Sequence, residues 1–192
     1  MTRRIELVAI GGSAGAIEVL RSVLSQLPRA LGPAVVVVVH LPPDGPNLLH
    51  EILATPGGPP MKVAEDKEPV APGTIYFAAP DYHLLIENGR TFALSLDERI
   101  HFSRPAIDVL FESAAAAYGD RMMGVVLSGA NADGAAGLAV VAASGGMTVV
   151  QSPEHAEMSA MPTAAFQAVP DSISVDASAL ATLLRAYGEV NV

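Results

Sequence analysis

The sequence predicts a doubly wound α/β fold, in which helices flank a mainly parallel β-sheet. Short runs of β-branched residues alternate with alanine-rich stretches of helical length over most of the 192 residues, and this alternation is typical of right-handed βαβ units. The run PAVVVVVH at 33–40 is apolar almost throughout, as expected for a strand that is covered on both faces. Hydrophobic residues make up 51% of the chain and charged residues 16%, which favours a well-buried core over disorder.

The first half of the chain is expected to contain two long strands and a small insertion. IELVAI at 5–10 predicts a strand, and residues 14–27 carry apolar side chains at helical spacing. The valine run is the second strand, and 44–54 is expected to include a short helix. GTIYFAAP, HLLIE and TFALSL predict shorter strands, the last two joined by the hairpin turn signal Asn88-Gly89. We therefore expect a short β-hairpin insertion near residues 74–95.

The α/β alternation resumes in the second half. Pro105 stands near the start of an expected helix and Gly119 at its end. The elements expected after it are the strand MMGVVLSG, a helix over 133–143, the strand MTVVQ, a short helix over 161–167, a strand in DSISV and a closing helix over 176–187. No convincing linker or internal repeat interrupts this series, so residues 1–192 are expected to form a single domain.

The composition argues against several classes of function. The chain has no cysteine, which excludes disulfides, thiolate nucleophiles and cysteine-based zinc sites and fits a cytoplasmic protein. Neither a signal peptide nor an apolar run of about 20 residues is found, so no direct insertion into a membrane is expected. A formal net charge of -9 without a basic stripe argues against nucleic acid as a partner. The five histidines show no H-x-x-x-H or H-E-x-x-H spacing, so no metal is expected. The oligomeric state stays open.

The loop Gly11-Gly12-Ser13-Ala14-Gly15 follows the first expected strand and satisfies the G-x-S-x-G pattern of a nucleophile elbow. Glycines permit a sharp strand-to-helix turn from which the Ser13 hydroxyl projects. Backbone N–H groups near Ser13 and Ala14 can hold an oxyanion, and Gly12 is also expected to line this site. The alternative is a loop that binds phosphate or only turns. G-x-G-x-x-G is not met and no Walker lysine is present, so a nucleotide-binding domain is the weaker interpretation.

Two further residues stand at the carboxyl ends of expected strands, where parallel sheets place their ligand sites. His40 ends the valine strand and either acts as a general base or forms a local hydrogen bond. Asp133 follows the strand GVVL in the loop SGANADG. It can cap the helix that it begins and also orient a histidine. The convergence of Ser13, His40 and Asp133 on one edge of the sheet predicts a catalytic triad.

Other polar residues compete for these roles. His83 stands at a strand start and is expected to be structural, whereas His155 lies in a polar loop and is expected to be solvated. His101 lies in the loop before Arg104 and can line the site, and Asp108 is an alternative acid. Arg104 either orients the substrate or forms a structural salt bridge.

The chain resembles the catalytic domain of the chemotaxis protein-glutamate methylesterases, the CheB type. The resemblance extends in order over nearly the whole chain and is carried by VAIGGSAGAIEVL, VVVHLPPDGPNLL, APGTIYFAAPDYHLLI, SRPAIDVLFESAAAAYG, GVVLSGANADGAAGLAVVAASGG and VVQSPEHAEMSAMPTAAF. It implies Ser13 as the nucleophile, His40 as the base and Asp133 as the third member of the triad. It also implies methylated glutamates on chemoreceptor cytoplasmic helices as the substrate, deamidation of receptor glutamines in some members, and no cofactor.

The chain departs from the usual family pattern at three places. Ser13-Ala14-Gly15-Ala16 replaces Ser-Thr-Gly-Gly, Gly129-Ala130 replaces Gly-Met, and Ala160-Met161-Pro162 replaces Gly-Met-Pro, with Met161 expected to line the substrate site. No member of the triad is lost. A non-catalytic signalling scaffold and an esterase for a different ester therefore stay open as alternatives.

Many relatives carry an N-terminal receiver domain that is phosphorylated. This chain begins a few residues before its first expected strand, so no attached receiver domain is expected in it. It is then either a stand-alone esterase or a piece of a longer protein, and the sequence leaves both interpretations open.

Overall fold

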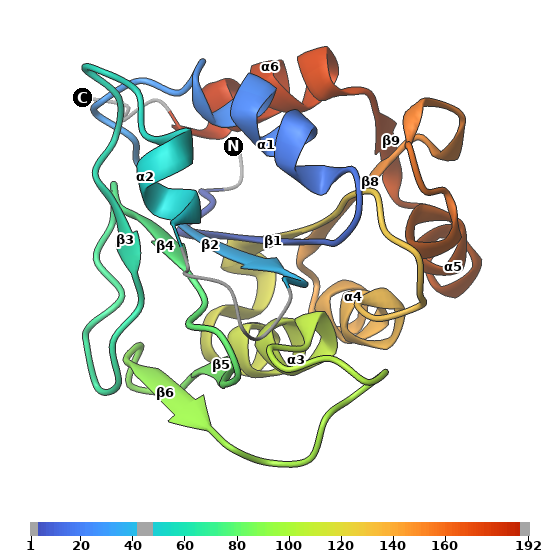
Figure 1. Ribbon diagram of the computed structural model, residues 1–192, viewed down its shortest axis with the longest axis horizontal. Coiled ribbons are helices and arrows are strands. Elements are labelled where there is room, and N and C mark those ends of the chain that lie inside the picture. The colour runs from blue at the N-terminus through green and yellow to red at the C-terminus, as the bar shows by residue number, and fades with distance from the viewer. Residues whose placement is uncertain (1–3, 42–47, 189–192) are drawn as a thin grey trace.

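The computed structural model describes residues 4–41 and 48–188 of the protein. Seven strands form one sheet in the order β3-β4-β2-β1-β7-β8-β9, and two further strands form a small antiparallel sheet, β5-β6 (Figure 1). The strands are β1 (Leu7–Gly12), β2 (Ala34–Val39), β3 (Met61–Val63), β4 (Ile75–Phe77), β5 (His83–Ile86), β6 (Phe92–Ser95), β7 (Met122–Val126), β8 (Met147–Gln151) and β9 (Ile173–Val175). Every pair of neighbours in the large sheet is parallel, so the expected doubly wound α/β class is confirmed.

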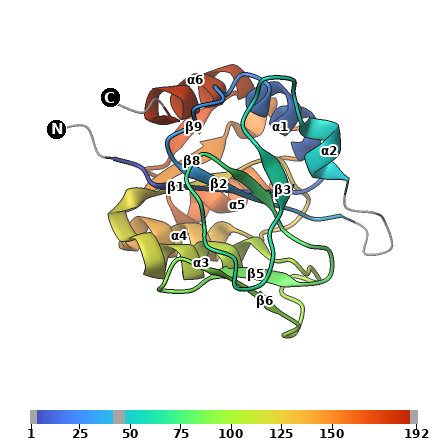
Figure 2. The same ribbon diagram turned by 90° about the vertical axis from the view of Figure 1, so that its left-hand side faces the viewer.

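Helices cover both faces of this sheet. They are α1 (Ala16–Leu24), α2 (Leu49–Leu53), α3 (Ile107–Tyr118), α4 (Ala135–Ala143), α5 (Ala160–Ala168) and α6 (Ala177–Gly188), with short 3₁₀ turns η1 (Gly119–Arg121) and η2 (Pro153–His155). Figures 1 and 2 both show α1, α2 and α6 on one face and α3 and α4 on the other. In the described part of the chain, no helix is long and apolar enough to cross a membrane.

The sheet separates two hydrophobic cores, because successive side chains of a strand point to opposite faces. Along β1, Leu7 and Ala9 join the core beneath α3, α4 and α5, whereas Val8 and Ile10 join the core beneath α1, α2 and α6. The six residues of β2, which form most of the valine run, are all buried. Covering on both faces therefore explains why this strand is apolar at every position rather than at alternate ones.

The strand order places the reversal of the chain path at β1. The chain leaves β1 for β2 on one side of it and later returns to β7 on the other side. The loop after β1 leads to α1 and the loop after β7 leads to α4, so the two loops diverge to opposite faces of the sheet. The carboxyl ends of β1 and β7 are therefore the topological switch point at which such sheets hold their ligands.

The insertion differs in detail from the expectation. Only β5 and β6 form the hairpin, with His83 opposite Ser95. The hairpin lies against α3 (Figure 2). The Ile86 N–H of β5 donates to Ser113 Oγ of α3 at 3.1 Å. Ile75–Phe77 instead pairs with β2 and with β3 in the main sheet, since its three side chains are fully buried. The three-residue edge strand β3 was not expected, because it is short and only half-buried.

Several helix boundaries also differ from the expectation. α1 begins at Ala16 rather than at 14, after Gly15 in a left-handed conformation with φ 79°. α2 covers Leu49–Leu53, the second half of the helix expected over 44–54, and residues 44–47 lie outside the described residues.

Candidate active site

The three residues of the expected triad follow neighbouring strands of the sheet. Ser13 comes directly after β1, His40 directly after β2, and Asp133 lies between β7 and α4. The strand ladder continues into these loops: the His40 N–H donates to the Gly12 carbonyl at 3.1 Å and the Ser13 N–H donates to the Ser128 carbonyl at 2.8 Å. The backbone thus holds the serine loop between the histidine on one side and the β7 loop on the other.

His40 and Asp133 form a direct pair. His40 Nε2 lies 2.7 Å from Asp133 Oδ2, with the aspartate side chain fully buried and the histidine 12% exposed. A buried carboxylate in this position fixes the orientation and tautomer of an imidazole and stabilises its protonated form. The ring therefore presents Nδ1 as the nitrogen available to a nucleophile.

Asp133 is held by a helix other than the one it precedes. Its carboxylate accepts the Ile107 N–H at 2.7 Å and the Asp108 N–H at 3.0 Å, so it caps the start of α3. We expected Asp133 to cap the following helix, and this was wrong: α4 begins at Ala135, and the residue before it is Gly134, whose φ is 93° and which provides no side-chain cap. The chain turns sharply at this glycine and directs the Asp133 side chain toward α3.

The surroundings of Asp133 favour its ionised form. Burial by itself would raise the pKa of Asp133, but the hydrogen bonds from His40 and from the Asp108 and Ile107 N–H groups outweigh it and lower the pKa below its usual value. Hydrogen bonds to a carboxylate favour the charged form, and the positive end of the α3 dipole acts in the same direction. The partner of His40 is thus an anion at neutral pH.

Ser13 lies beside this pair without a hydrogen bond to it. The hydroxyl is half-buried, and it forms no hydrogen bond with the part of the chain that the structure describes. The structure therefore joins His40 to Asp133 directly and brings Ser13 into the adjacent loop. Catalytic hydrogen bonds between a serine and its base often form only when substrate is bound.

The peptide groups after Ser13 have a fixed orientation. The Ser13 carbonyl accepts the Ala16 N–H at 3.0 Å, and the Ala14 carbonyl accepts the Ser128 hydroxyl at 2.7 Å. Within residues 4–41 and 48–188, the N–H groups of Ala14 and Gly15 have no hydrogen-bond acceptor. Two free N–H groups next to a serine are the donors that an oxyanion requires, whereas the Ser13 N–H is already used in the bond to Ser128.

Gly12 contributes through close packing. It is the last residue of β1, and a Cβ at this position would lie 2.5 Å from the Ala16 Cβ. Glycine therefore allows α1 to start directly against the end of the strand.

Sequence reasoning missed the role of Ser128. This fully buried residue follows β7, donates to Ala14, accepts the Met158 N–H at 2.9 Å and donates its own N–H to Gln151 Oε1 at 2.8 Å. A hydroxyl buried at the carboxyl end of a parallel strand, in a loop of small residues, was the available signal. It ties the loop that carries Ser13 to the segment before α5.

Arg104 and Met161 occupy supporting positions. Arg104 pairs with Asp81 at 3.0 Å and donates to the Leu96 and Asp97 carbonyls at 2.9 and 3.1 Å. The side chain of Met161 is fully buried, and a Cβ at Gly129 would lie 2.5 Å from its Cε. Met161 therefore packs against the β7 loop from the interior. We expected it to line the substrate site, but it has no exposed surface that a substrate could contact.

The other histidines lie apart from the His40–Asp133 pair. His83 is buried, accepts the Ala106 N–H at Nδ1 and lies 3.0 Å from the Glu98 carbonyl through Nε2, so its role is structural. His155 is exposed in η2. His101 Nε2 lies 3.7 Å from Asp108 Oδ2. Among the residues that the structure describes, no group of three His, Cys, Asp or Glu side chains is placed to hold a metal ion.

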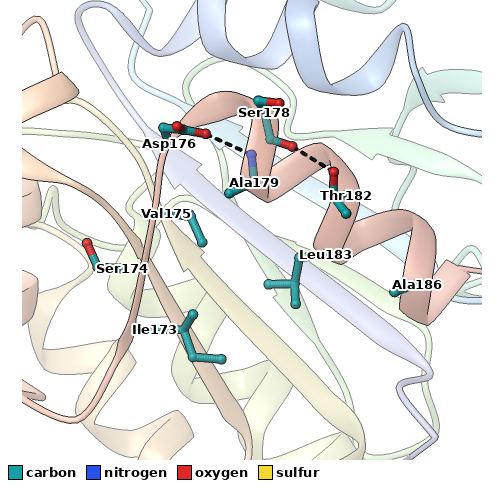
Figure 3. Close-up of a pocket in the computed structure, with 9 residues that line it drawn as sticks. All are labelled: Ile173, Ser174, Val175, Asp176, Ser178, Ala179, Thr182, Leu183 and Ala186. Atoms are coloured by element: carbon teal, nitrogen blue, oxygen red, sulfur yellow. Dashed lines mark hydrogen bonds between the residues drawn. The ribbon is translucent and has the colours of Figure 1, made fainter.

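A separate groove lies away from these residues. It measures about 610 Å³ and runs between edge strand β9 and α6, lined by residues such as Ile173 and Leu183 (Figure 3). None of the triad residues contributes to it.

Comparisons with known proteins agree with this geometry. The sequence model of the family described as "CheB methylesterase" matches residues 8–184. A "putative protein-glutamate methylesterase/protein-glutamine glutaminase" of Leptospira interrogans is 44% identical over 163 residues, which cover 85% of this chain and 84% of that protein. The "protein-glutamate methylesterase/protein-glutamine glutaminase 1" of Rhodospirillum rubrum is 36% identical over 85% of this chain, which corresponds to 44% of its own length.

Solved structures include a similar fold. The crystal structure of the Thermotoga maritima CheB methylesterase catalytic domain superposes with a TM-score of 0.87 at 29% sequence identity. The match covers 95% of this chain and 98% of that one.

Proposed function

The chain belongs to the CheB methylesterase family, and on this premise we propose that it hydrolyses glutamate methyl esters on chemoreceptor helices with Ser13 as nucleophile. The observation that carries the proposal is the His40–Asp133 pair, 2.7 Å apart, at the end of the strand next to the Ser13 loop. A histidine that is oriented by a buried carboxylate and adjoins a serine is the arrangement that activates a hydroxyl for acyl transfer.

The geometry supports a two-step reaction. His40 accepts the Ser13 proton at Nδ1 as the hydroxyl oxygen attacks the ester carbonyl, and the imidazolium is stabilised by ionised Asp133. The free N–H groups of Ala14 and Gly15 donate hydrogen bonds to the negative oxygen that the ester carbonyl becomes. His40 returns the proton to the leaving oxygen, and methanol departs from the glutamyl-enzyme. Water then attacks this ester with His40 again as base, which releases a glutamate carboxylate and restores Ser13.

The same residues can act on a glutamine side chain. In that case His40 gives the proton to the leaving nitrogen, ammonia departs, and the same glutamyl-enzyme is hydrolysed. The relatives from Leptospira interrogans and Rhodospirillum rubrum carry both activities in their names. We accordingly extend the proposal to deamidation, and to a cytoplasmic protein whose partner is the cytoplasmic helical part of a chemoreceptor.

The test is methanol release from a methylated chemoreceptor cytoplasmic fragment by the protein and its Ser13→Ala variant. Ser25→Ala is the matched control, because this exposed serine directly follows α1 and its hydroxyl only donates to the Ser22 carbonyl of that helix. We expect release by the wild type and by the control but not by Ser13→Ala. Release of methanol by Ser13→Ala at the wild-type rate would contradict the assignment of Ser13 as the nucleophile. No release by any of the proteins from several receptors, all of them folded, would favour a scaffold or a different ester.

A further inference from the structure

We propose that Asp108 is a positioning residue, which sets the place of the Asp133 carboxylate beside His40 through the first turn of α4. The inference rests on the proposed function, since it concerns the same triad. Among the described residues, Asp108 forms no hydrogen bond or ion pair with His40 or Ser13, so its effect is exerted through Asp133.

The N-termini of α3 and α4 are capped reciprocally: an aspartate from each helix start accepts N–H groups of the other. We call this arrangement the carboxylate exchange. Asp133, just before α4, accepts the N–H groups of Ile107 and Asp108 at the start of α3. Asp108, in the first turn of α3, accepts the N–H groups of Gly134 at 2.9 Å and Gly137 at 2.7 Å at the start of α4. Each aspartate therefore satisfies N–H groups that the other helix leaves without partners, and four hydrogen bonds fix the two helix ends to each other.

This exchange needs a close approach of the two helices. A Cβ at Gly137 would lie 2.7 Å from the Phe111 Cβ and 2.9 Å from the Asp108 Cα. A Cβ at Gly134 would lie 2.8 Å from the Ile107 Cγ2. Glycines at the start of α4 thus let α3 lie directly against it, and the Asp108 oxygen reaches the backbone rather than solvent.

The exchange controls the catalytic carboxylate because Gly134 directly follows Asp133. Asp133 Oδ2 accepts from both the Ile107 N–H and His40 Nε2, each at 2.7 Å, so a small rotation of the carboxylate weakens both contacts. The bond from the Gly134 N–H to Asp108 fixes the peptide group that joins Asp133 to Gly134. Removing that bond frees the backbone from which the catalytic side chain projects.

Capping of α4 alone does not explain why Asp108, a second buried carboxylate beside Asp133, stands at this position. Asp108 is 5% exposed, and two buried anions in contact with the same helix ends repel each other. Burial raises the pKa of Asp108 and the nearby Asp133 charge adds to this, despite the N–H bonds from Gly137 and Gly134. A serine or threonine would cap α4 without this cost. The groups that face Asp108 are Asp133 and, at 3.7 Å, the half-exposed His101.

The test measures how fast a fluorophosphonate probe labels Ser13, together with kcat and KM for methanol release. Asp108→Ala removes the acceptor, whereas Asp108→Asn keeps an oxygen for Gly134 and Gly137. Asp176→Ala is the matched control, since Asp176 accepts the Ala179 N–H at 2.7 Å and caps the exposed start of α6 (Figure 3). None of the triad residues belongs to this helix or to the strand before it.

We expect Asp108→Ala to lower the labelling rate and kcat on the order of 10- to 100-fold with KM unchanged, since small displacements of catalytic groups have effects of this size. Asp108→Asn should stay within about threefold of the wild type, and Asp176→Ala should label at the wild-type rate even if its Tm falls. Wild-type labelling by folded Asp108→Ala overturns the proposal. An Asp108→Asn variant as slow as Asp108→Ala also overturns it, because the charge and not the position would then matter.

A further variant covers the case in which Asp108→Ala does not fold. Asp108→Glu keeps the charge but moves the oxygens by one methylene, so positioning predicts slow labelling by this variant and near-normal labelling by Asp108→Asn. The reverse order overturns the proposal. A wild-type protein that is not labelled at all would instead contradict Ser13 as nucleophile, which separates failure of this inference from failure of the proposed function.

Discussion

His40 presents Nε2, not Nδ1, to Asp133, at a distance of 2.7 Å from Oδ2. Because the carboxylate accepts a hydrogen bond, the proton of the neutral imidazole lies on Nε2 and the lone pair lies on Nδ1. In the proposed mechanism, Asp133 therefore determines which nitrogen of His40 takes the Ser13 proton, and we expect a single substitution to reverse this choice.

Asp133→Asn should reverse this choice of His40 nitrogen. With its nitrogen in the place of Oδ2, the Asn amide donates to Nε2, which moves the imidazole proton to Nδ1 and leaves no lone pair for Ser13. In that orientation the nitrogen faces the Ile107 N–H, and in the other it faces the Asp108 N–H. Either orientation removes the negative charge that stabilises the imidazolium. We expect kcat for methanol release to fall by about 10³- to 10⁴-fold, while circular dichroism shows a folded protein. Asp120→Asn, at an exposed position in η1, is the control. Activity within tenfold of wild type in Asp133→Asn would contradict the assignment of the triad.

Ser128→Ala tests the orientation of the peptide groups after Ser13. The variant loses the donor to the Ala14 carbonyl and the acceptor of the Met158 N–H, so the Gly15 N–H is no longer held in place. We expect kcat to fall on the order of 10- to 100-fold with a small change in KM, because oxyanion donors act in the transition state.

The control for Ser128 is Ser113→Ala. Ser113 is partly buried, accepts the Ile86 N–H at 3.1 Å and donates to the Val109 carbonyl at 2.8 Å, but it joins α3 to the hairpin. Equal losses of kcat in the two variants would mean that Ser128 acts only through stability.

Gly137→Ala tests the contact between α3 and α4. The added methyl would meet the Asp108 Cα and carbonyl oxygen at 2.9 and 3.0 Å, and backbone atoms cannot move aside as a flexible side chain can. We expect a loss of about 1–3 kcal/mol in the free energy of unfolding, measured by urea denaturation, and reduced labelling of Ser13. Gly89→Ala should change neither, because nothing lies within 4 Å of the added atom. Full stability of Gly137→Ala would show that the helices are not closely packed.

The sequence predicted the large features because each leaves a local pattern. The valine run marks a doubly covered strand, the glycine loop marks the turn that carries Ser13, and His40 stands at the end of its strand. The family expectation was confirmed by the match over residues 8–184. The capping partner of Asp133 was missed, since a residue before a helix is most simply assigned to that helix. The partner lies 26 positions away along the chain, at Ile107, and only the packing of α3 on α4 brings the two together.

The pH dependence of stability should differ in sign between the two exchanged carboxylates. The pKa of Asp133 is lowered on folding, burial being outweighed by its hydrogen bonds. Its contribution is therefore present above the usual carboxyl range, about pH 4, and is lost as pH falls through the folded pKa. The pKa of Asp108 is raised, mainly by burial. Its contribution is present below that range and is lost as pH rises through the folded value.

Urea denaturation of the wild type, Asp133→Asn and Asp108→Asn between about pH 3 and 7 measures this difference. As the pH falls through the carboxyl range, about pH 4, the stability advantage of the wild type over Asp133→Asn should shrink, because wild-type Asp133 becomes protonated. Over the same interval the wild type should gain stability relative to Asp108→Asn, because protonation removes a buried charge that repels Asp133. Parallel curves for all three proteins would mean that neither carboxylate changes its proton affinity on folding. Curves that move in the same direction would contradict the opposed environments that the exchange creates.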